Sequence, residues 1–131
     1  MRFFIVFVLL LSSLSANHIN WYANYDKAHE EALKEGKGIM IFLIKKDCDI
    51  CKKTLQKTFM NQSYIDTINS NFVSVIVVKN QKSSYPLEML YTLEYPVVFF
   101  LDNIELFSCN PIYGNITPNS LKNHLEKCFS E

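Results

Sequence analysis

The sequence predicts an α/β domain in which helices cover both faces of a central mixed four-stranded sheet. Two apolar runs, residues 39–44 and Phe72–Val78, lack the alternation of a half-exposed strand and therefore indicate strands buried on both faces. Segments with helical periodicity alternate with these runs along the chain. A third apolar run, Val97–Leu101, is followed by a turn and a short apolar stretch at residues 104–107, which predicts an antiparallel edge.

Length and charge exclude several classes of protein. The chain has 131 residues with 13 basic and 13 acidic side chains, so it can bury one modest core and carries no formal net charge. A multidomain protein is not expected at this length. Nucleic-acid binding is also not expected, because phosphates demand clustered cations and the chain has a single arginine, Arg2.

The first 16 residues are typical of a secretory signal peptide. Arg2 precedes an unbroken apolar run at residues 3–11, and small or polar residues follow up to Ala16. A run from 3 to 11 is too short for a membrane-spanning helix, which needs roughly 20 apolar residues. We expect cleavage near Ser15 or Ala16, one domain over residues 17–131, and a periplasmic or secreted protein whose cysteines meet an oxidising compartment.

The first half of the domain alternates helix and strand. Apolar residues at helical spacing predict a helix that starts at Trp21: Trp21, Tyr25, Ala28 and Ala32. Gly36 and Gly38 are expected to end this helix. The strand at residues 39–44 follows. A polar break at residues 45–47 then leads to a second helix that begins near Cys48 and bends near Asn61 before the strand Phe72–Val78.

The second half contains proline signals at its element boundaries. Pro86 is expected to open a short helix, which the Tyr95-Pro96 pair stops before the strand Val97–Leu101. Asp102-Asn103 then reads as a tight turn leading to an edge strand at residues 104–107. Thr117 is expected to cap the last helix.

The chemistry is concentrated in Cys48 and Cys51, at the junction between the first predicted strand and its helix. Unpaired N–H groups and the helix dipole stabilise a thiolate at Cys48, and Cys51 lies on the same helical face within reach. The pair is therefore predicted to act as a two-electron switch. Asp49 and Ile50 should tune its potential, and the negative charge of Asp49 disfavours the thiolate, which favours a reductase.

Lysines flank the motif on both sides. Lys45, Lys46, Lys52 and Lys53 would stabilise a thiolate, but exposed lysines are largely screened by solvent and salt. We interpret them as a solvated surface.

The chain resembles the thioredoxin-fold family, and more closely its exported bacterial members. The strand at residues 39–44, the Cys48-Asp49-Ile50-Cys51 motif and Tyr95-Pro96 before a strand carry the resemblance. It implies a thiol-disulfide oxidoreductase with Cys48 as nucleophile and Cys51 as resolving thiol. It also implies a cis-proline at Pro96, with the backbone of Tyr95 offering a strand-like edge to an extended substrate.

One position departs from the family pattern. Many thioredoxins carry a buried acid six residues before the first cysteine, and this chain has Phe42 there. Asp47, Lys45 or water would have to move the proton of the second cysteine, or the resolving step is slow.

The expected clients are exported proteins with disulfides or thiols. By family analogy a membrane donor would supply the electrons, and we expect a monomer without a cofactor. Two alternatives remain open. The same fold can use Cys48 and Cys51 to bind or deliver copper, or it can be a structural protein with inert disulfides.

The second cysteine pair, Cys109 and Cys128, is either a structural disulfide or two buried small apolar side chains. A zinc site is not predicted, because four-cysteine sites normally show two Cys-x-x-Cys knuckles and the chain has one. The scattered histidines His18, His29 and His124 are interpreted as two surface residues and one residue on a helix face.

Overall fold

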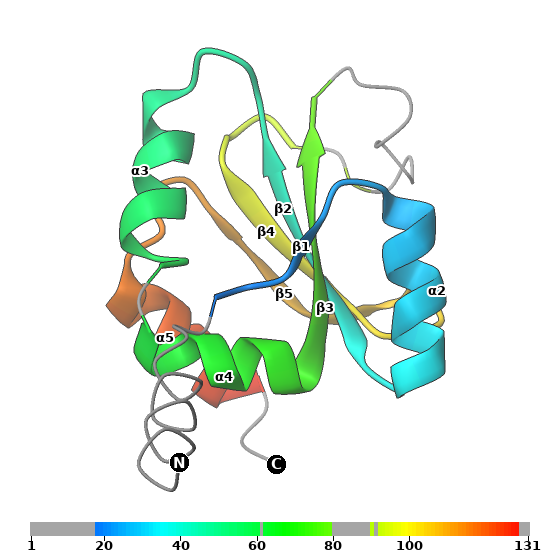
Figure 1. Cartoon of the computed structure of the whole chain (residues 1–131). Coiled ribbons are helices and arrows are strands. Elements are labelled where there is room, and N and C mark those ends of the chain that lie inside the picture. Colours follow the sequence, from blue (N-terminus) through cyan, green and yellow to red (C-terminus); the bar gives the residue numbers. More distant parts are fainter. Residues whose placement is uncertain (1–17, 61, 80–89, 91, 129–131) are drawn as a thin grey trace, which may run out of the picture.

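The structure, a computed structural model, describes residues 18–60, 62–79, 90 and 92–128. It contains a mixed five-stranded sheet in the order β1-β3-β2-β4-β5 (Figure 1). Along the chain the elements are β1 (Trp21–Tyr22), α2 (Tyr25–Glu35), β2 (Gly38–Ile44), α3 (Asp49–Lys57), α4 (Gln62–Asn71), β3 (Phe72–Val78), β4 (Val97–Leu101), β5 (Phe107–Tyr113) and α5 (Pro118–Cys128). The α/β class is confirmed, with one strand more than predicted.

The two longest apolar runs form the centre of the sheet. β2 and β3 pair in parallel from Gly38↔Phe72 to Ile44↔Val78, and β4 lies antiparallel on the other side of β2. Alternate residues of β2 point to opposite faces, so Ile41 packs with Ala28 of α2, whereas Met40 packs with residues of α4 and α5. Helices therefore cover both faces, with α2 on one side and α3, α4 and α5 on the other (Figure 1).

The prediction that the first helix begins at Trp21 is wrong. Trp21 belongs to β1, which pairs with β3 through Trp21↔Ser74. The side chain of Asn24 accepts a hydrogen bond of 3.1 Å from the backbone N–H of Lys27 and caps α2, which begins at Tyr25. The helix ends at Gly36, whose φ of 67° is the left-handed conformation that glycine adopts without strain.

The predicted antiparallel hairpin is confirmed, but the bounds predicted for its second strand are wrong. The carboxylate of Asp102 accepts hydrogen bonds of 3.0 Å from the backbone N–H groups of both Ile104 and Leu106, which holds residues 102–106 in a turn. β5 therefore runs over Phe107–Tyr113 and not over residues 104–107. It contains Pro111, which an edge strand tolerates because one side of its backbone needs no partner strand.

The second predicted helix is two helices in the structure, and the last predicted helix is confirmed. α3 begins directly after Cys48, α4 follows as a separate helix after a break, and α5 begins at Pro118. The hydroxyl of Thr117 accepts a 3.1 Å hydrogen bond from the backbone N–H of Ser120, which confirms the predicted cap. The helix expected from Pro86 and the signal peptide at residues 1–16 lie outside the described residues. None of the helices in the described ranges has the length and apolar character needed to cross a membrane.

Candidate functional site

Cys48 and Cys51 form a disulfide at the N-terminus of α3. Cys48 is the N-cap residue with an extended backbone (φ −112°, ψ 101°), and its Sγ accepts a hydrogen bond of 3.1 Å from the backbone N–H of Cys51. Sulfur thus occupies the place that a serine or aspartate oxygen normally takes at a helix start. When the disulfide is reduced, the same N–H group and the helix dipole favour negative charge on Cys48.

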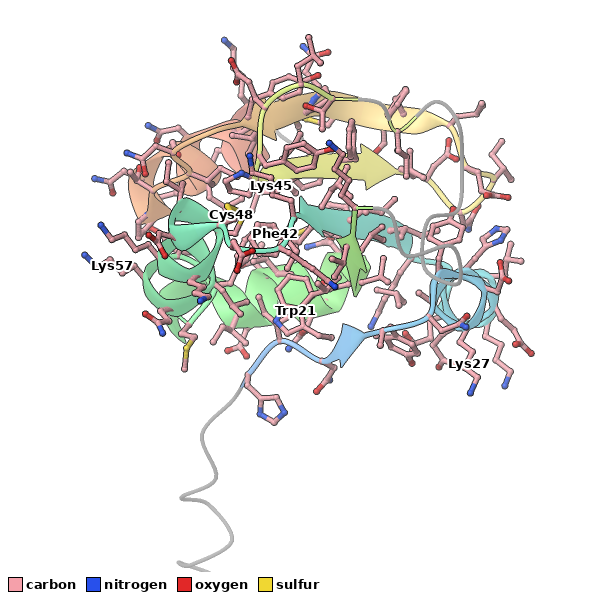
Figure 2. The ribbon with its side chains drawn as sticks, turned by 90° about the horizontal axis from the view of Figure 1, so that it is seen from above. Trp21, Lys27, Phe42, Lys45, Cys48 and Lys57 are labelled. Atoms are coloured by element: carbon pink, nitrogen blue, oxygen red, sulfur yellow. A yellow bond between two sulfur atoms is a disulfide. The ribbon has the colours of Figure 1, made fainter. Side chains whose placement is uncertain are left out.

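Exposure distinguishes the residues of the motif. Cys48 is 8% exposed and Cys51 is 3% exposed, so Cys48 is the more accessible residue of the pair. Ile50 is 48% exposed, and Asp49 also lies at the surface. Lys45 and Lys46 are exposed on the loop before the motif, and Figure 2 shows Lys45 close to Cys48 at this end of the sheet.

Tyr95 and Pro96 lie at the same end of the sheet. Their peptide bond is cis, as the resemblance implies. Val97 pairs with Leu43 near the end of β2, which places the buried Pro96 beside the segment that leads to Cys48. The carbonyl oxygen of Pro96 accepts a 2.8 Å hydrogen bond from the backbone N–H of Gly114, which fixes the start of β4 against the end of β5.

Two ammonium groups approach the ring of Tyr95. Lys45 Nζ lies 5.6 Å and Lys79 Nζ 5.4 Å from the ring centroid, within the range of cation–π attraction. Lys79 was not singled out from the sequence. The parallel pairing Ile44↔Val78 explains its position, because Lys45 and Lys79 each follow a strand that ends at the same edge.

Phe42 fills the place of the buried acid. Its side chain is 1% exposed, and its ring centroid lies 4.8 Å from that of Phe59 and 5.9 Å from that of Trp21. Figure 2 labels Phe42 and Trp21, which extend this aromatic cluster across the face of the sheet that α3 and α4 cover. Asp47 and Lys45, the candidate substitutes, are exposed on the loop and not buried beneath the motif.

The fold and the cysteine motif agree with the comparisons. The family model described as thioredoxin-like matches residues 20–103, which include β1 to β4 and the motif. The chain belongs to the thioredoxin-like family. A thioredoxin-like fold with a Cys48–Cys51 pair is the arrangement of thiol-disulfide oxidoreductases in general.

Solved structures show the same fold. A putative disulphide-isomerase from Bacteroides thetaiotaomicron superposes with a TM-score of 0.71 at 21% identity, covering 89% of this chain and 98% of that one. A thioredoxin from Thermus thermophilus gives 0.68 at 16% identity, with coverages of 88% and 90%. A DsbH oxidoreductase gives 0.67 at 16% identity, with coverages of 89% and 88%. A search of the curated proteins finds no match.

This thioredoxin-like chain has a second disulfide, between Cys109 of β5 and Cys128 of α5. The sequence left this pairing open. His124 Nε2 lies 3.2 Å from Cys109 Sγ, and its ring stacks on Phe100 with centroids 5.6 Å apart. The interpretation of His124 as a residue on a helix face is therefore incomplete. Its spacing of four residues from Cys128 places both on one side of a helix, but the contact with Cys109 depends on how α5 packs on β5.

Proposed function

We propose that the chain is an exported thiol-disulfide oxidoreductase that reduces disulfides in other exported proteins. The observation that carries the exchange chemistry is the position of Cys48 as the N-cap of α3, with its sulfur 3.1 Å from the backbone nitrogen of Cys51. The signal-like segment at residues 1–16 supports export, and clients with disulfides follow from the oxidising compartment.

The exchange proceeds from the reduced pair. The Cys48 thiolate attacks one sulfur of the client disulfide, that bond breaks, and a mixed disulfide forms. Cys51 then loses its proton and attacks Cys48 Sγ, which releases the client as a dithiol and closes Cys48–Cys51. Two electrons pass from the chain to the client, and a membrane-bound dithiol donor returns them. No carboxylate at position 42 can accept the proton of Cys51, because Phe42 occupies that place in the aromatic cluster. We therefore expect resolution to be the slower step.

The surface around the motif suits an extended client segment. Tyr95 and Pro96 lie beside the segment that leads to the Cys48–Cys51 motif. A cleft of about 470 Å³ borders the motif at Ile50 and is also lined by Lys53 and Lys57 of α3 and by residues at the start of α5. Because Lys45 and Lys79 also gather at Tyr95, we expect clients with acidic residues near their disulfide to react faster at low salt.

Asp49 favours the reductase direction of electron flow. Its exposed carboxylate lies in the first turn of α3, next to Cys48, and disfavours the thiolate of the reduced form. We expect a potential below about −180 mV, the value typical of a disulfide isomerase. Titration in glutathione or dithiothreitol buffers, with the redox state read by mass spectrometry, measures it. A more oxidising value would refute the reductase direction and leave the exchange chemistry in place.

The decisive experiment traps the intermediate. We expect Cys51→Ala in the full chain, expressed in a bacterium that exports it, to accumulate mixed disulfides with exported proteins through Cys48. Cys48→Ala/Cys51→Ala is the matched control and should trap nothing. Recovery of no disulfide-linked partner from a folded Cys51→Ala variant would count against exchange. Cell fractionation of the same cultures and N-terminal sequencing test export and cleavage near Ser15 or Ala16.

The copper alternative is weaker at this site. Within the described ranges, the one group of three or more candidate metal ligands includes neither Cys48 nor Cys51. Among the described residues, a copper site on this pair would therefore have two thiolates and no histidine.

A further inference from the structure

The second cysteine pair and His124 bring three potential metal-ligand atoms together. Cys109 Sγ, His124 Nε2 and Cys128 Sγ all lie within 4.8 Å of one another, and they form the one group of three candidate metal ligands in the part of the chain that the structure describes. Cys109 comes from β5, and His124 and Cys128 come from successive turns of α5. Regular elements that pack together, and not a loop, therefore hold the three side chains.

Packing fixes this group in place. Cys109 is 9% exposed, and the ring of His124 lies against Phe100 of β4. Leu121 and Leu125 of α5 are buried in the same core and hold the helix on the sheet. His124 and Cys128 are each only half-buried, which leaves an approach from solvent. The cluster is preorganised and accessible, as a metal site requires.

We propose that the dithiol form of Cys109 and Cys128, together with His124, binds one thiophilic d¹⁰ cation, Zn²⁺ or Cu⁺. Two thiolates and one imidazole are a set that both cations accept, Zn²⁺ with a water as fourth ligand and Cu⁺ with three ligands alone. Metal–sulfur bonds of about 2.3 Å and metal–nitrogen bonds of about 2.0 Å place sulfur and nitrogen ligands roughly 3.5 Å apart. Cys109 Sγ and His124 Nε2 are 3.2 Å apart in the disulfide form.

The site opens and closes with the redox state of the pair. A protein or small-molecule dithiol first reduces Cys109–Cys128: the S–S bond breaks, two electrons and two protons enter, and the dithiol becomes a disulfide. Cation binding then releases the two thiol protons without changing the oxidation state of the metal. His124 Nε2 donates its hydrogen bond to the carbonyl oxygen of Asn110 in the disulfide form, so ligation requires the other tautomer. The proton leaves Nε2 to water, Nδ1 takes a proton from water, and the free lone pair of Nε2 binds the cation. The inference does not rest on the proposed function, because Cys48 and Cys51 take no part.

Titration of the full-length chain carrying Cys48→Ser and Cys51→Ser isolates the site. After reduction with dithiothreitol and anaerobic desalting, Zn²⁺ is added in one arm and Cu⁺ in the other, each against a chromophoric chelator. We expect one cation per chain in at least one arm, and the arm that binds identifies the metal. The disulfide form should bind neither cation. Absence of one-to-one binding in both arms overturns the proposal.

His124→Phe tests the third ligand, because phenylalanine keeps a ring on Phe100 and removes both nitrogens. Loss of a partner that merely orients a ligand already costs 10–100-fold in metal affinity, so we expect His124→Phe to weaken binding by at least about 100-fold. His18→Phe, at an exposed histidine outside the cluster, should bind as tightly as the parent. Equal affinities for His124→Phe and the parent overturn the proposal. Should circular dichroism show His124→Phe to be unfolded, Cys128→Ser in the same background provides the ligand deletion, with the same two outcomes.

Discussion

The two disulfides of this chain lie on the same side of the sheet but constrain it in different ways. Cys48–Cys51 joins residues three apart at the start of α3, and Cys109–Cys128 joins residues 19 apart, connecting β5 to α5. The first bond spans a single helical turn that hydrogen bonds already shape, including the one from the backbone N–H of Cys51 to Cys48 Sγ. The second ties an edge strand to the last helix.

The different sequence separations of the two disulfides suggest different roles, one in thiol-disulfide exchange and one in stability. A bond within one turn can open and close while the sheet and helices keep their places, because its two ends belong to one local structure. A bond between distant elements removes more conformational freedom from the unfolded chain and so contributes more to stability. We therefore expect the first pair to carry the activity and the second pair to carry stability.

The largest expected difference is in exchange activity. Cys48→Ser removes the attacking sulfur and should lower the rate of insulin disulfide reduction on the order of a thousand-fold or more, to the uncatalysed background. Cys109→Ser is the matched change in the other disulfide and should leave the rate within about twofold, because its sulfur takes no part in the exchange. The comparison fails if folded Cys109→Ser loses activity to the same extent.

For stability, removal of the Cys109–Cys128 disulfide should have the larger effect and removal of Cys48–Cys51 the smaller one. Chain entropy predicts a loss of about 3 kcal/mol in the free energy of unfolding for Cys109→Ser/Cys128→Ser and about 2 kcal/mol for Cys48→Ser/Cys51→Ser. Urea unfolding monitored by circular dichroism measures both values against the oxidised parent. A larger loss for the Cys48/Cys51 double variant would show that local packing and not loop length dominates.

Sequence reasoning identified the central elements because their signals are local. The strand Phe72–Val78 and the start of α5 at Pro118 follow from an apolar run and from a cap with a proline. The errors arose where side chains redirected the backbone. Asn24 starts α2 later than the periodicity suggests, and Asp102 extends the turn before β5.

In the candidate site, too, the parts that are local in sequence could be predicted and the parts that depend on tertiary contacts could not. The Cys48–Cys51 motif is contiguous in sequence and could be identified directly, although the catalytic roles stay a prediction. Its surroundings depend on tertiary contacts. The lysines at Tyr95 meet through strand pairing, and His124 meets Cys109 only because α5 packs on β5. No spacing in the sequence reports a contact between a strand and a helix 15 residues away.

A hydrogen bond holds the far end of the β4–β5 hairpin, where no cysteine lies. The hydroxyl of Tyr25 in α2 donates a 2.9 Å hydrogen bond to the carboxylate of Glu105 in the turn, and His29 lies 3.6 Å from the same carboxylate. Burial raises the pKa of Tyr25 well above its usual value of 10, and the bond to Glu105 raises it further. This contact is a non-covalent counterpart of the Cys109–Cys128 bond.

Tyr25→Phe should lower the free energy of unfolding by about 1.5 kcal/mol at pH 7, the lower end of the range for a hydrogen bond to a charged group. The pKa of Tyr25 is higher in the folded chain than in the unfolded chain, where it is about 10. The stabilisation from its hydroxyl is therefore fully present below pH 10 and is lost as the pH rises through the pKa of the folded chain. The difference between parent and variant should therefore shrink above pH 10 in the oxidised chain, whose closed disulfides do not titrate. Urea unfolding at pH 7, 9 and 11 tests this, and a difference that is constant with pH would contradict it.

The smallest expected effect concerns the charge beside Cys48. Asp49→Asn removes a carboxylate from the first turn of α3, which stabilises the thiolate of the reduced form. An exposed charge interaction of about 0.5 kcal/mol corresponds to a rise of roughly 10 mV in the two-electron potential. Glutathione titration at low salt measures the rise, which should diminish at high salt. Asp26→Asn makes the same change in the first turn of α2, where no cysteine lies, and should leave the potential unchanged. Equal shifts in both variants would mean that net charge, and not the position of Asp49 beside Cys48, sets the potential. A fall in the Asp49→Asn variant would mean that the carboxylate stabilises the dithiol form, and the argument for a reductase from this residue would be lost.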